Sequence, residues 1–205
     1  NLTNAERAAF YNSGTEAIMV AMRLARTYTN RNKIVIFAGS YHGTFDGVLA
    51  ISGGNTTTPM VPGTTQGTID DIVVLKYGDQ ESLKIIESLK DDLAGIIIEP
   101  VQSRRPDIQP KAFIHALKVI TEANDCALIF DEVITGFRVH PQGAQGHFGV
   151  QADIATYGKV IGGGLPIGIV AGKSKYLDAI DGGHWKYGDQ SYPSVRTTFA
   201  AGTFC

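Results

Sequence analysis

The stretch Ala127-Leu128-Ile129-Phe130-Asp131-Glu132 decides the fold class, because it is a short apolar run that ends in two acids. Residues 111–124, just before it, have the apolar spacing of a helix, and Pro110 stands ahead of them, where proline is well tolerated. A short, continuously apolar run is typical of a strand that helices cover on both faces. These two segments therefore predict a helix followed by a buried strand of a parallel sheet.

The same alternation extends over the rest of the chain. Further apolar runs and helical patterns predict strands at 34–37, 72–75, 95–98, 154–157 and 167–170, and helices at 16–27 and 80–90. Such alternation predicts an α/β fold with a mostly parallel sheet and helices on both faces. Ligands of these folds bind outside the carboxyl ends of the strands. Residues 52–68 hold four glycines, six threonines and two prolines, which predicts a long irregular surface loop.

Composition excludes several classes of protein. The 205 residues are 43% hydrophobic and 19% charged, and a net charge of −2 argues against a nucleic-acid surface and against affinity for anionic membranes. No apolar run is long enough to span a bilayer and no signal-peptide pattern occurs, so we expect a cytoplasmic protein. Cys126 and Cys205 make no disulfide framework, and we expect Cys126 to be a buried small hydrophobe. The five histidines form no cluster with metal-ligand spacing, so we predict no metal site.

The ends of the sequence also raise an expectation. It begins at Asn1 without a methionine and stops at Cys205, directly after a segment of apolar residues and glycine. We expect the chain to be a piece of a longer polypeptide whose flanks could hold substrate-binding residues.

Two segments offer charge-binding groups. Residues 12–17, Asn-Ser-Gly-Thr-Glu-Ala, open a predicted helix, and free backbone N–H groups, hydroxyls and the helix dipole there could cradle a phosphate. The alternative is a simple N-cap with Glu16 in the first turn. Asp131 and Glu132 end a dry strand, where a carboxylate could hold a cationic group such as a protonated pyridine nitrogen. Their alternative role is a helix cap or a loop acid.

Two further segments could contact a ligand. Lys159 lies between an apolar strand and the three glycines at 162–164, and a partly buried lysine amine beside a ligand can form a Schiff base. The alternative is a strand-end lysine whose ammonium reaches solvent. Tyr41 could stack on a flat heteroaromatic ring, and His42 could donate a hydrogen bond or move a proton. Ordinary packing of these two residues at a corner of the chain is the alternative.

A nucleotide-binding protein is a competing interpretation. Residues 168–174, Gly-Ile-Val-Ala-Gly-Lys-Ser, resemble the phosphate loop of nucleoside triphosphatases. That loop requires four residues between its glycines, whereas three stand here, and the acidic strand precedes the glycines instead of following them. No G-x-G-x-x-G follows a strand and opens a helix, which argues against a dinucleotide site as well.

Taken together, these segments resemble the class III (ornithine-type) aminotransferases of the fold-type I pyridoxal 5'-phosphate (PLP) family, and among them glutamate-1-semialdehyde aminomutase. The similarity covers essentially the whole chain and is most specific at 131–139 and 158–168, where Ile134 replaces the glutamine common in the ornithine-type branch. Residues 99–106 and 182–189 also resemble aminotransferase domains of hybrid polyketide/nonribosomal peptide synthetases, of the cyanobacterial microcystin and nodularin type and of the iturin and mycosubtilin type.

The resemblance implies a role for each matching residue. Lys159 matches the Schiff-base lysine, which also moves a proton, and Asp131 matches the acid that pairs with the pyridine nitrogen. The other matches are contacts to the cofactor, namely Ser13, Gly14 and Thr15 at the phosphate, Tyr41 and His42 at the ring, Val133 on its other face, and Gly202 and Thr203 at the phosphate of a neighbouring subunit. That last contact implies a homodimer.

The resemblance also implies an activity. Residues 1–205 would form the PLP-binding large domain, without the family's N-terminal segment and small C-terminal domain. An amino acid, glutamate in the family, would donate its amino group to a β-keto acyl chain on a carrier protein, whose phosphate Arg104 and Arg105 could meet unless they are an exposed loop pair. The alternatives are glutamate-1-semialdehyde 2,1-aminomutase activity and a catalytically silent scaffold, which the retention of Lys159 and Asp131 disfavours.

Overall fold

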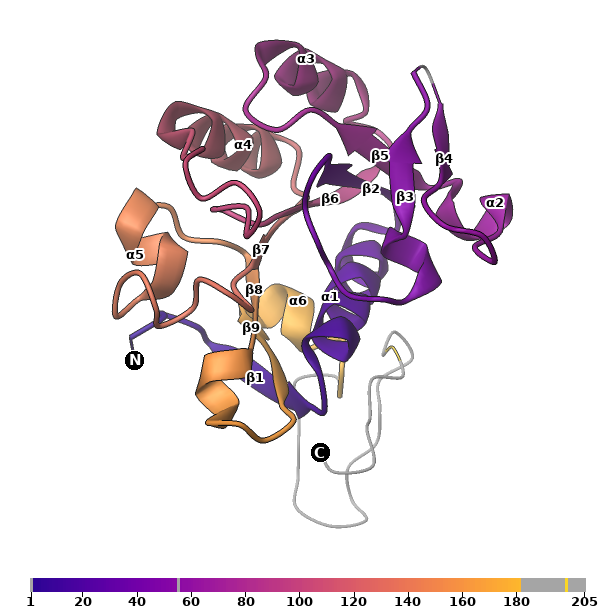
Figure 1. Ribbon diagram of the computed structural model, residues 1–205. Helices are drawn as coiled ribbons and strands as arrows, with labels where there is room; N and C mark the ends of the chain where they lie inside the picture. Colours follow the sequence, from indigo (N-terminus) through magenta and orange to yellow (C-terminus); the bar gives the residue numbers. More distant parts are fainter. Residues whose placement is uncertain (1, 55, 182–197, 199–205) are drawn as a thin grey trace.

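A seven-stranded sheet with helices on both faces forms the centre of the computed structural model, which describes residues 2–54, 56–181 and 198 (Figure 1). Across the sheet the strands follow the order β1 (Arg7–Tyr11), β9 (Gly168–Gly172), β8 (Ile154–Gly158), β7 (Ala127–Asp131), β6 (Leu93–Ile98), β2 (Lys33–Phe37) and β5 (Ile72–Leu75). The pairs from β8 to β5 are parallel, whereas β9 runs antiparallel to both of its neighbours. The predicted mostly parallel α/β fold is confirmed.

Each face of the sheet has its own apolar core. Helices α1 (Gly14–Thr29), α2 (Gln66–Ile69) and α6 (Ser174–Leu177) cover one face, and α3 (Gln80–Ser88), α4 (Lys111–Ala123) and α5 (Gly143–Phe148) cover the other. Along β7, Ala127 and Ile129 join the first core, while Leu128 and Phe130 join the second. Both faces of the strand are therefore dry, which explains why its sequence is continuously apolar. Each of the three larger side chains, Leu128, Ile129 and Phe130, contributes about 1.5–3 kcal/mol through burial.

The strand register brings distant segments together at one edge of the sheet. Tyr11 at the end of β1 pairs with Gly168 at the start of β9, and Gly168 pairs with Gly158 at the end of β8. The start of α1 at Gly14 and the residue after β8, Lys159, consequently lie at the same edge, next to the end of β7.

The prediction of an irregular loop over 52–68 is wrong in part. This region contains the hairpin of β3 (Ala50–Ser52) and β4 (Thr57–Pro59) and the short helix α2. The hydroxyl of Thr57 donates to the carbonyl of Ile72 (2.7 Å), and Gln66 Nε2 donates to the Thr57 carbonyl (3.1 Å). Contacts with the edge strand β5 thus order a segment whose composition is typical of a loop.

Several short elements carry no strong pattern in the sequence. They are β1, α5, α6 and the 3-10 turns η1 (Asp46–Val48) and η2 (Lys159–Gly162). Cys126 is buried just before β7, as expected, and burial raises the pKa of its thiol to about 12. Within the part of the chain that the structure describes, no helix is both long and apolar enough to cross a lipid bilayer.

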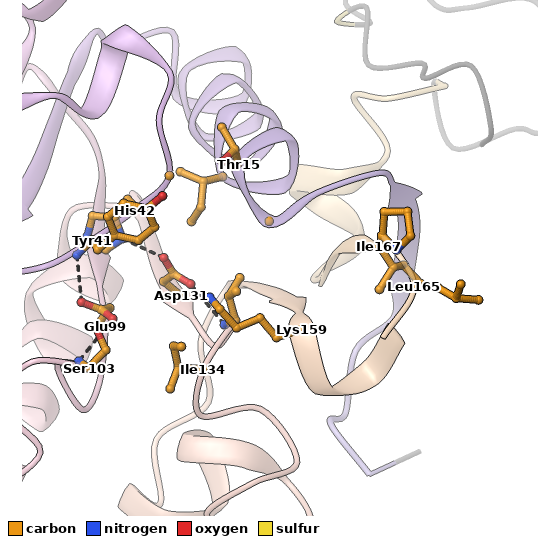
Figure 2. Close-up of a pocket in the computed structure, with 15 residues that line it drawn as sticks. Thr15, Tyr41, His42, Glu99, Ser103, Asp131, Ile134, Lys159, Leu165 and Ile167 are labelled. Carbon is orange, nitrogen blue, oxygen red and sulfur yellow. Dashed lines mark hydrogen bonds and ion pairs between the residues drawn. The ribbon is translucent and has the colours of Figure 1, made fainter. Parts of the chain in front are cut away.

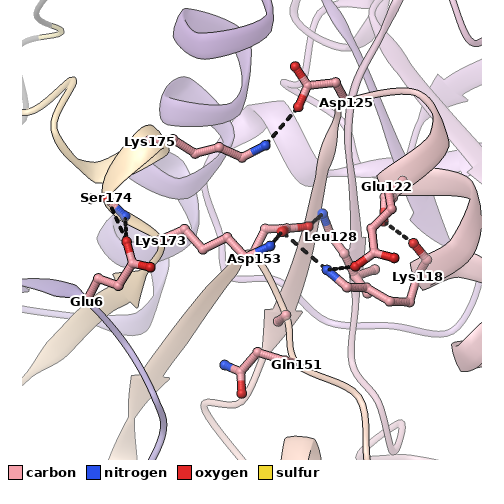
Figure 3. A network of polar contacts seen from close by, with 12 residues as sticks. Glu6, Lys118, Glu122, Asp125, Leu128, Gln151, Asp153, Lys173, Ser174 and Lys175 are labelled. Atoms are coloured by element: carbon pink, nitrogen blue, oxygen red, sulfur yellow. Dashed lines mark hydrogen bonds and ion pairs between the residues drawn. The ribbon is translucent and has the colours of Figure 1, made fainter.

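A buried carboxylate ties three strands together at the opposite edge of the sheet (Figure 3). Asp153, which precedes β8, accepts a hydrogen bond from the backbone N–H of Leu128 (2.9 Å). Its other carboxylate oxygen lies 2.6 Å from Nζ of Lys173 and 3.3 Å from Nζ of Lys118. This network links the start of β7, the start of β8 and the end of β9 to helix α4, far along the strands from the site described below.

Candidate active site

A cavity of about 310 Å³ opens where β7 and β8 end and α1 begins (Figure 2). Seven of the predicted site residues line it: Gly14, Thr15, Tyr41, His42, Asp131, Val133 and Lys159. They come from four separate stretches of the sequence, which the strand register brings to one edge. Ser13 does not line the cavity, and Gly202 and Thr203 lie outside the described residues.

The start of α1 combines the two alternatives that its sequence allows. The hydroxyl of Ser13 accepts a hydrogen bond from the N–H of Glu16 (3.2 Å), and the Glu16 carboxylate accepts one from the N–H of Asn12 (2.7 Å). Ser13 is thus the N-cap, and its hydroxyl oxygen serves the helix, while a contact between this residue and a phosphate stays a prediction. Gly14 and Thr15 still present the first turn of the helix to the cavity, where backbone N–H groups lack intrahelical acceptors.

Glycines allow the close contacts around this turn. A β-carbon on Gly168 would overlap the carbonyl group of Ser13, so β9 can lie against the turn only because residue 168 lacks a side chain. Gly43 has a φ of +99°, and a β-carbon there would press on Thr15. These two positions hold the segment after β2 and the start of β9 against the start of α1.

The two acids that end β7 have different functions. Oδ2 of Asp131 lies 2.8 Å from Nδ1 of His42, and Oδ1 accepts a hydrogen bond from the N–H of Val133 (3.2 Å). Both side chains are buried yet border the cavity, and Nε2 of His42 has no hydrogen-bond partner among the described residues. Asp131 is therefore a fixed carboxylate with one side toward the cavity.

Glu132 faces away from the cavity and caps a helix. Its carboxylate accepts hydrogen bonds from the N–H groups of Ala144 (2.7 Å) and Gln145 (3.2 Å) in the first turn of α5, and from the Thr135 hydroxyl (2.9 Å). Burial is the main influence on this carboxyl and raises its pKa, although these hydrogen bonds oppose the shift. The sequence leaves two roles open for these acids, a carboxylate that faces a ligand and a helix cap. In the structure, Asp131 faces the cavity and Glu132 caps the helix.

Lys159 follows β8 directly and has a φ of +47°, in the left-handed region that non-glycine residues seldom adopt. Such a conformation costs about 1–3 kcal/mol and is concentrated at functional sites. Lys159 is exposed, and its partial burial beside a ligand stays a prediction. It stands in η2, outside the packed strand, and its side chain borders the open cavity that Asp131 also lines (Figure 2).

Glu99 is a site residue to which sequence reasoning assigned no chemistry. It follows β6, lines the cavity and is buried. Its two oxygens accept hydrogen bonds from the N–H groups of Tyr41 (2.9 Å) and Ser103 (3.4 Å). Burial raises the pKa of this carboxyl above the ordinary value. An acid directly after the apolar run 95–98 is the same signal that singled out Asp131.

The loop after Glu99 also carries the two adjacent arginines. Arg104 and Arg105 are exposed, and Arg105 forms a two-bond ion pair with Asp107 (3.0 and 3.2 Å). These observations favour the interpretation of Arg104 and Arg105 as an exposed pair on a loop over a contact with the phosphate of a carrier protein.

Comparison with known proteins places this site in a family. The model of the class III aminotransferases matches residues 1–201. Glutamate-1-semialdehyde 2,1-aminomutase of Methanococcus maripaludis is 45% identical over 179 residues, which are 85% of this chain and 42% of that protein. This chain thus spans less than half the length of the curated relatives that it matches.

Solved structures agree with the family assignment. A transaminase with PLP bound superposes with a TM-score of 0.81 at 38% identity, over 88% of this chain and 43% of the other. A β-phenylalanine aminotransferase from Variovorax paradoxus has a TM-score of 0.74 at 32% identity, over 91% and 41%. The fold is that of the fold-type I PLP transferases, and the chain belongs to the class III aminotransferase family.

Proposed function

We propose that this chain is the cofactor-binding part of a PLP-dependent aminotransferase. The observation that supports the proposal most strongly is the meeting of Asp131, Lys159 and the first turn of α1 around one cavity. These are a buried anion, an amine and a set of N–H donors, which match the pyridine nitrogen, the aldehyde and the phosphate of PLP. A cavity of about 310 Å³ is of the size that small cofactors occupy.

In this proposal each residue around the cavity has a separate role. PLP, when bound, supplies the electron sink that allows an amino group to pass between a donor and a keto acceptor. Asp131 would hold the protonated pyridine nitrogen, while His42 keeps the carboxylate in place. Lys159 would attach the cofactor through its amine and, once released, take the proton from the α-carbon of the donor. Tyr41 and Val133 would contact the two faces of the ring.

The attachment can be tested by chemical trapping. The chain is incubated with PLP, reduced with borohydride and digested, and the peptides are weighed by mass spectrometry. We expect a pyridoxyl group on the peptide that contains Lys159 and none at this site in Lys159→Ala. Lys76→Ala, which removes a lysine that is exposed at the end of β5, is the control. A label spread evenly over the exposed lysines of every variant would contradict the proposal.

For the acceptor, we propose a β-keto acyl chain on a carrier protein, with an amino acid such as glutamate as the donor. The sequence resemblance at 99–106 supports it, and so does the structural likeness to an enzyme named for a β-amino acid, β-phenylalanine. The second candidate is 2,1-aminomutase activity on glutamate-1-semialdehyde, which the names of the 45% identical relatives favour. When a β-keto acyl thioester of pantetheine is the acceptor, an aminotransferase should convert the amino donor into its keto acid, which can be measured. An aminomutase would instead isomerise glutamate-1-semialdehyde without forming a keto acid.

We also propose a homodimer in which Gly202 and Thr203 complete the partner's phosphate site. Mixing two inactive variants tests this arrangement. When Lys159→Ala and Thr203→Ala chains are mixed, half of the sites in the mixed dimer combine an intact Lys159 with an intact Thr203. PLP attachment should therefore reappear on mixing. No recovery, together with a monomeric mass by sedimentation, would contradict the dimer.

A further inference from the structure

One wall of the cavity consists of the turn after β2, residues 38–42, and the loop after β6, residues 99–103. Glu99 bridges these two segments, because its carboxylate accepts hydrogen bonds from the N–H of Tyr41 (2.9 Å) and from the N–H of Ser103 (3.4 Å). Figure 2 shows Glu99 between Tyr41 and Ser103, with dashed lines that mark these two hydrogen bonds. A buried carboxylate that accepts two backbone N–H groups is a strong, directional anchor.

Gln102 makes a second bridge between the same two segments. Its Nε2 donates to the carbonyl of Ala38 (2.9 Å) and to the hydroxyl of Ser40 (2.9 Å), and the side chain is 3% exposed. The turn bends sharply here, since Gly39 has a φ of +87° and lies directly against the Gln102 amide. Unlike Glu99, Gln102 does not border the cavity. Any effect of Gln102 on a ligand must therefore pass through the turn.

Tyr41 depends on its backbone for its position. Its side chain is 47% exposed and lines the cavity. Within the described residues, the ring makes no hydrogen bond and no aromatic contact that would hold it, and the Tyr41 N–H bond to Glu99 is the polar contact that fixes the residue. The position of the Tyr41 backbone therefore determines where its ring can lie in the cavity.

We propose that Glu99 and Gln102 are positioning residues, which clamp the turn 38–42 so that Tyr41 lies at the height needed to stack on the cofactor ring. This inference rests on the proposed function. The clamp preorganises an aromatic platform before the ligand arrives, so that binding does not have to order the turn.

A double-mutant cycle on PLP affinity tests whether Gln102 acts through Tyr41. The dissociation constant is measured by absorbance titration for the unchanged chain, Gln102→Met, Tyr41→Ala and the double variant. Gln102→Met keeps the volume but removes the donor of the two hydrogen bonds that hold the turn, and we expect roughly tenfold weaker binding. In the Tyr41→Ala background, the same change should have almost no further effect on binding.

Two comparisons separate positioning from loss of stability. Gln145→Met alters another buried glutamine, which donates to the Tyr157 hydroxyl (3.0 Å) away from the cavity. It should lower the thermal midpoint by a similar amount and leave the PLP affinity unchanged. Glu99→Gln, which keeps an acceptor for the Tyr41 N–H, should weaken binding less than Glu99→Leu.

If Gln102→Met fails to fold, Ser40→Ala removes one of the two Gln102 bonds and replaces it in the cycle. Equal effects of the substitution with and without the Tyr41 ring would overturn the inference, while PLP binding itself remained intact. Failure of the unchanged chain to bind PLP or to trap it on Lys159 would instead contradict the proposed function, and the inference with it.

Discussion

Nδ1 of His42 lies 2.8 Å from Oδ2 of Asp131, and the two residues are only 4% and 5% exposed. The other carboxylate oxygen accepts a hydrogen bond from the N–H of Val133 (3.2 Å). Both oxygens of Asp131 are therefore fixed by the protein before any ligand binds. A carboxylate held in this way needs little reorganisation to meet a cationic partner, which is the arrangement that gives electrostatic preorganisation its effect.

Replacing the imidazole tests this arrangement. In His42→Phe, Oδ2 of Asp131 loses its partner while it stays buried, and a hydrogen bond to a charged group is worth about 1.5–3 kcal/mol. We expect PLP to bind roughly tenfold more weakly, measured by absorbance titration. His147→Phe alters an exposed histidine on α5 and should leave the affinity unchanged. Equal affinities for all three proteins would show that Asp131 does not need His42.

A single methyl group at Gly168 should disturb the start of α1. In Gly168→Ala, the added β-carbon would overlap the carbonyl group of Ser13, so the turn or β9 must shift. Such overpacking costs about 1–3 kcal/mol, and the shift would move the N–H groups of Gly14 and Thr15. Urea unfolding and PLP titration should both show a loss.

Gly67→Ala is the matched control for that change. Gly67 lies in α2, and nothing stands within 4 Å of the added β-carbon. The PLP affinity of this variant should equal that of the unchanged chain. Its stability should be equal or slightly higher, because alanine restricts the unfolded state. A Gly168→Ala protein that behaves like Gly67→Ala would contradict the close packing at Ser13.

The buried strands could be predicted from the sequence almost to the residue, whereas the edge elements could not. The run at 127–130 matches β7 to within one residue, because two dry faces require a continuous apolar pattern. Strand β1, Arg-Ala-Ala-Phe-Tyr, contains no β-branched residue and forms by pairing with β9. Such an edge strand depends on tertiary contacts, which local sequence does not encode.

The site was predictable in its location but not in its division of labour. The rule that ligands meet the carboxyl ends of strands singles out Asp131 and Lys159. It cannot distinguish Asp131 from Glu132, since which of two adjacent acids faces the cavity depends on how the chain leaves β7. Nor could it show that the Ser13 hydroxyl is used by the helix cap or that Glu99 anchors Tyr41, because both depend on atomic distances between separate segments.

The Asp153 network should stabilise the fold without affecting the site. Asp153→Asn removes the charge that Lys118 and Lys173 share, and breaking a buried ion pair costs about 3–5 kcal/mol. Since the Lys173 side chain is 38% exposed, solvent screening reduces this, and we expect a loss of about 2 kcal/mol in urea unfolding. Asp125→Asn, which breaks the exposed pair with Lys175, should cost less than about 1 kcal/mol. A large loss of PLP affinity in Asp153→Asn would contradict the conclusion that this network and the cavity, at opposite ends of the strands, act independently.

The helix cap Glu132 should make the stability of the fold depend on pH. Because burial raises the pKa of this carboxyl above its ordinary value of 4.5, the folded chain holds the proton more tightly than the unfolded chain does. Stability from this group is therefore complete below pH 4.5 and declines as the pH rises from there through the folded pKa. Glu132→Gln cannot titrate, so it should escape this decline, which amounts to about 1.4 kcal/mol for each unit by which the pKa is raised.

The measurement is the free energy of unfolding in urea at pH 4.5, 6 and 7.5 for the unchanged chain, Glu132→Gln and Glu87→Gln. Glutamine also perturbs the hydrogen bonds to Ala144 and Gln145, but that cost does not vary with pH and so cancels from the slope. Glu99 has a raised pKa as well, and it contributes the same slope to all three proteins. Glu87 is exposed on α3, so its variant should run parallel to the unchanged chain. The free energy of unfolding of Glu132→Gln should rise relative to that of the other two proteins as the pH rises. If its difference from the unchanged chain stays constant from pH 4.5 to 7.5, the burial of Glu132 does not oppose its ionisation.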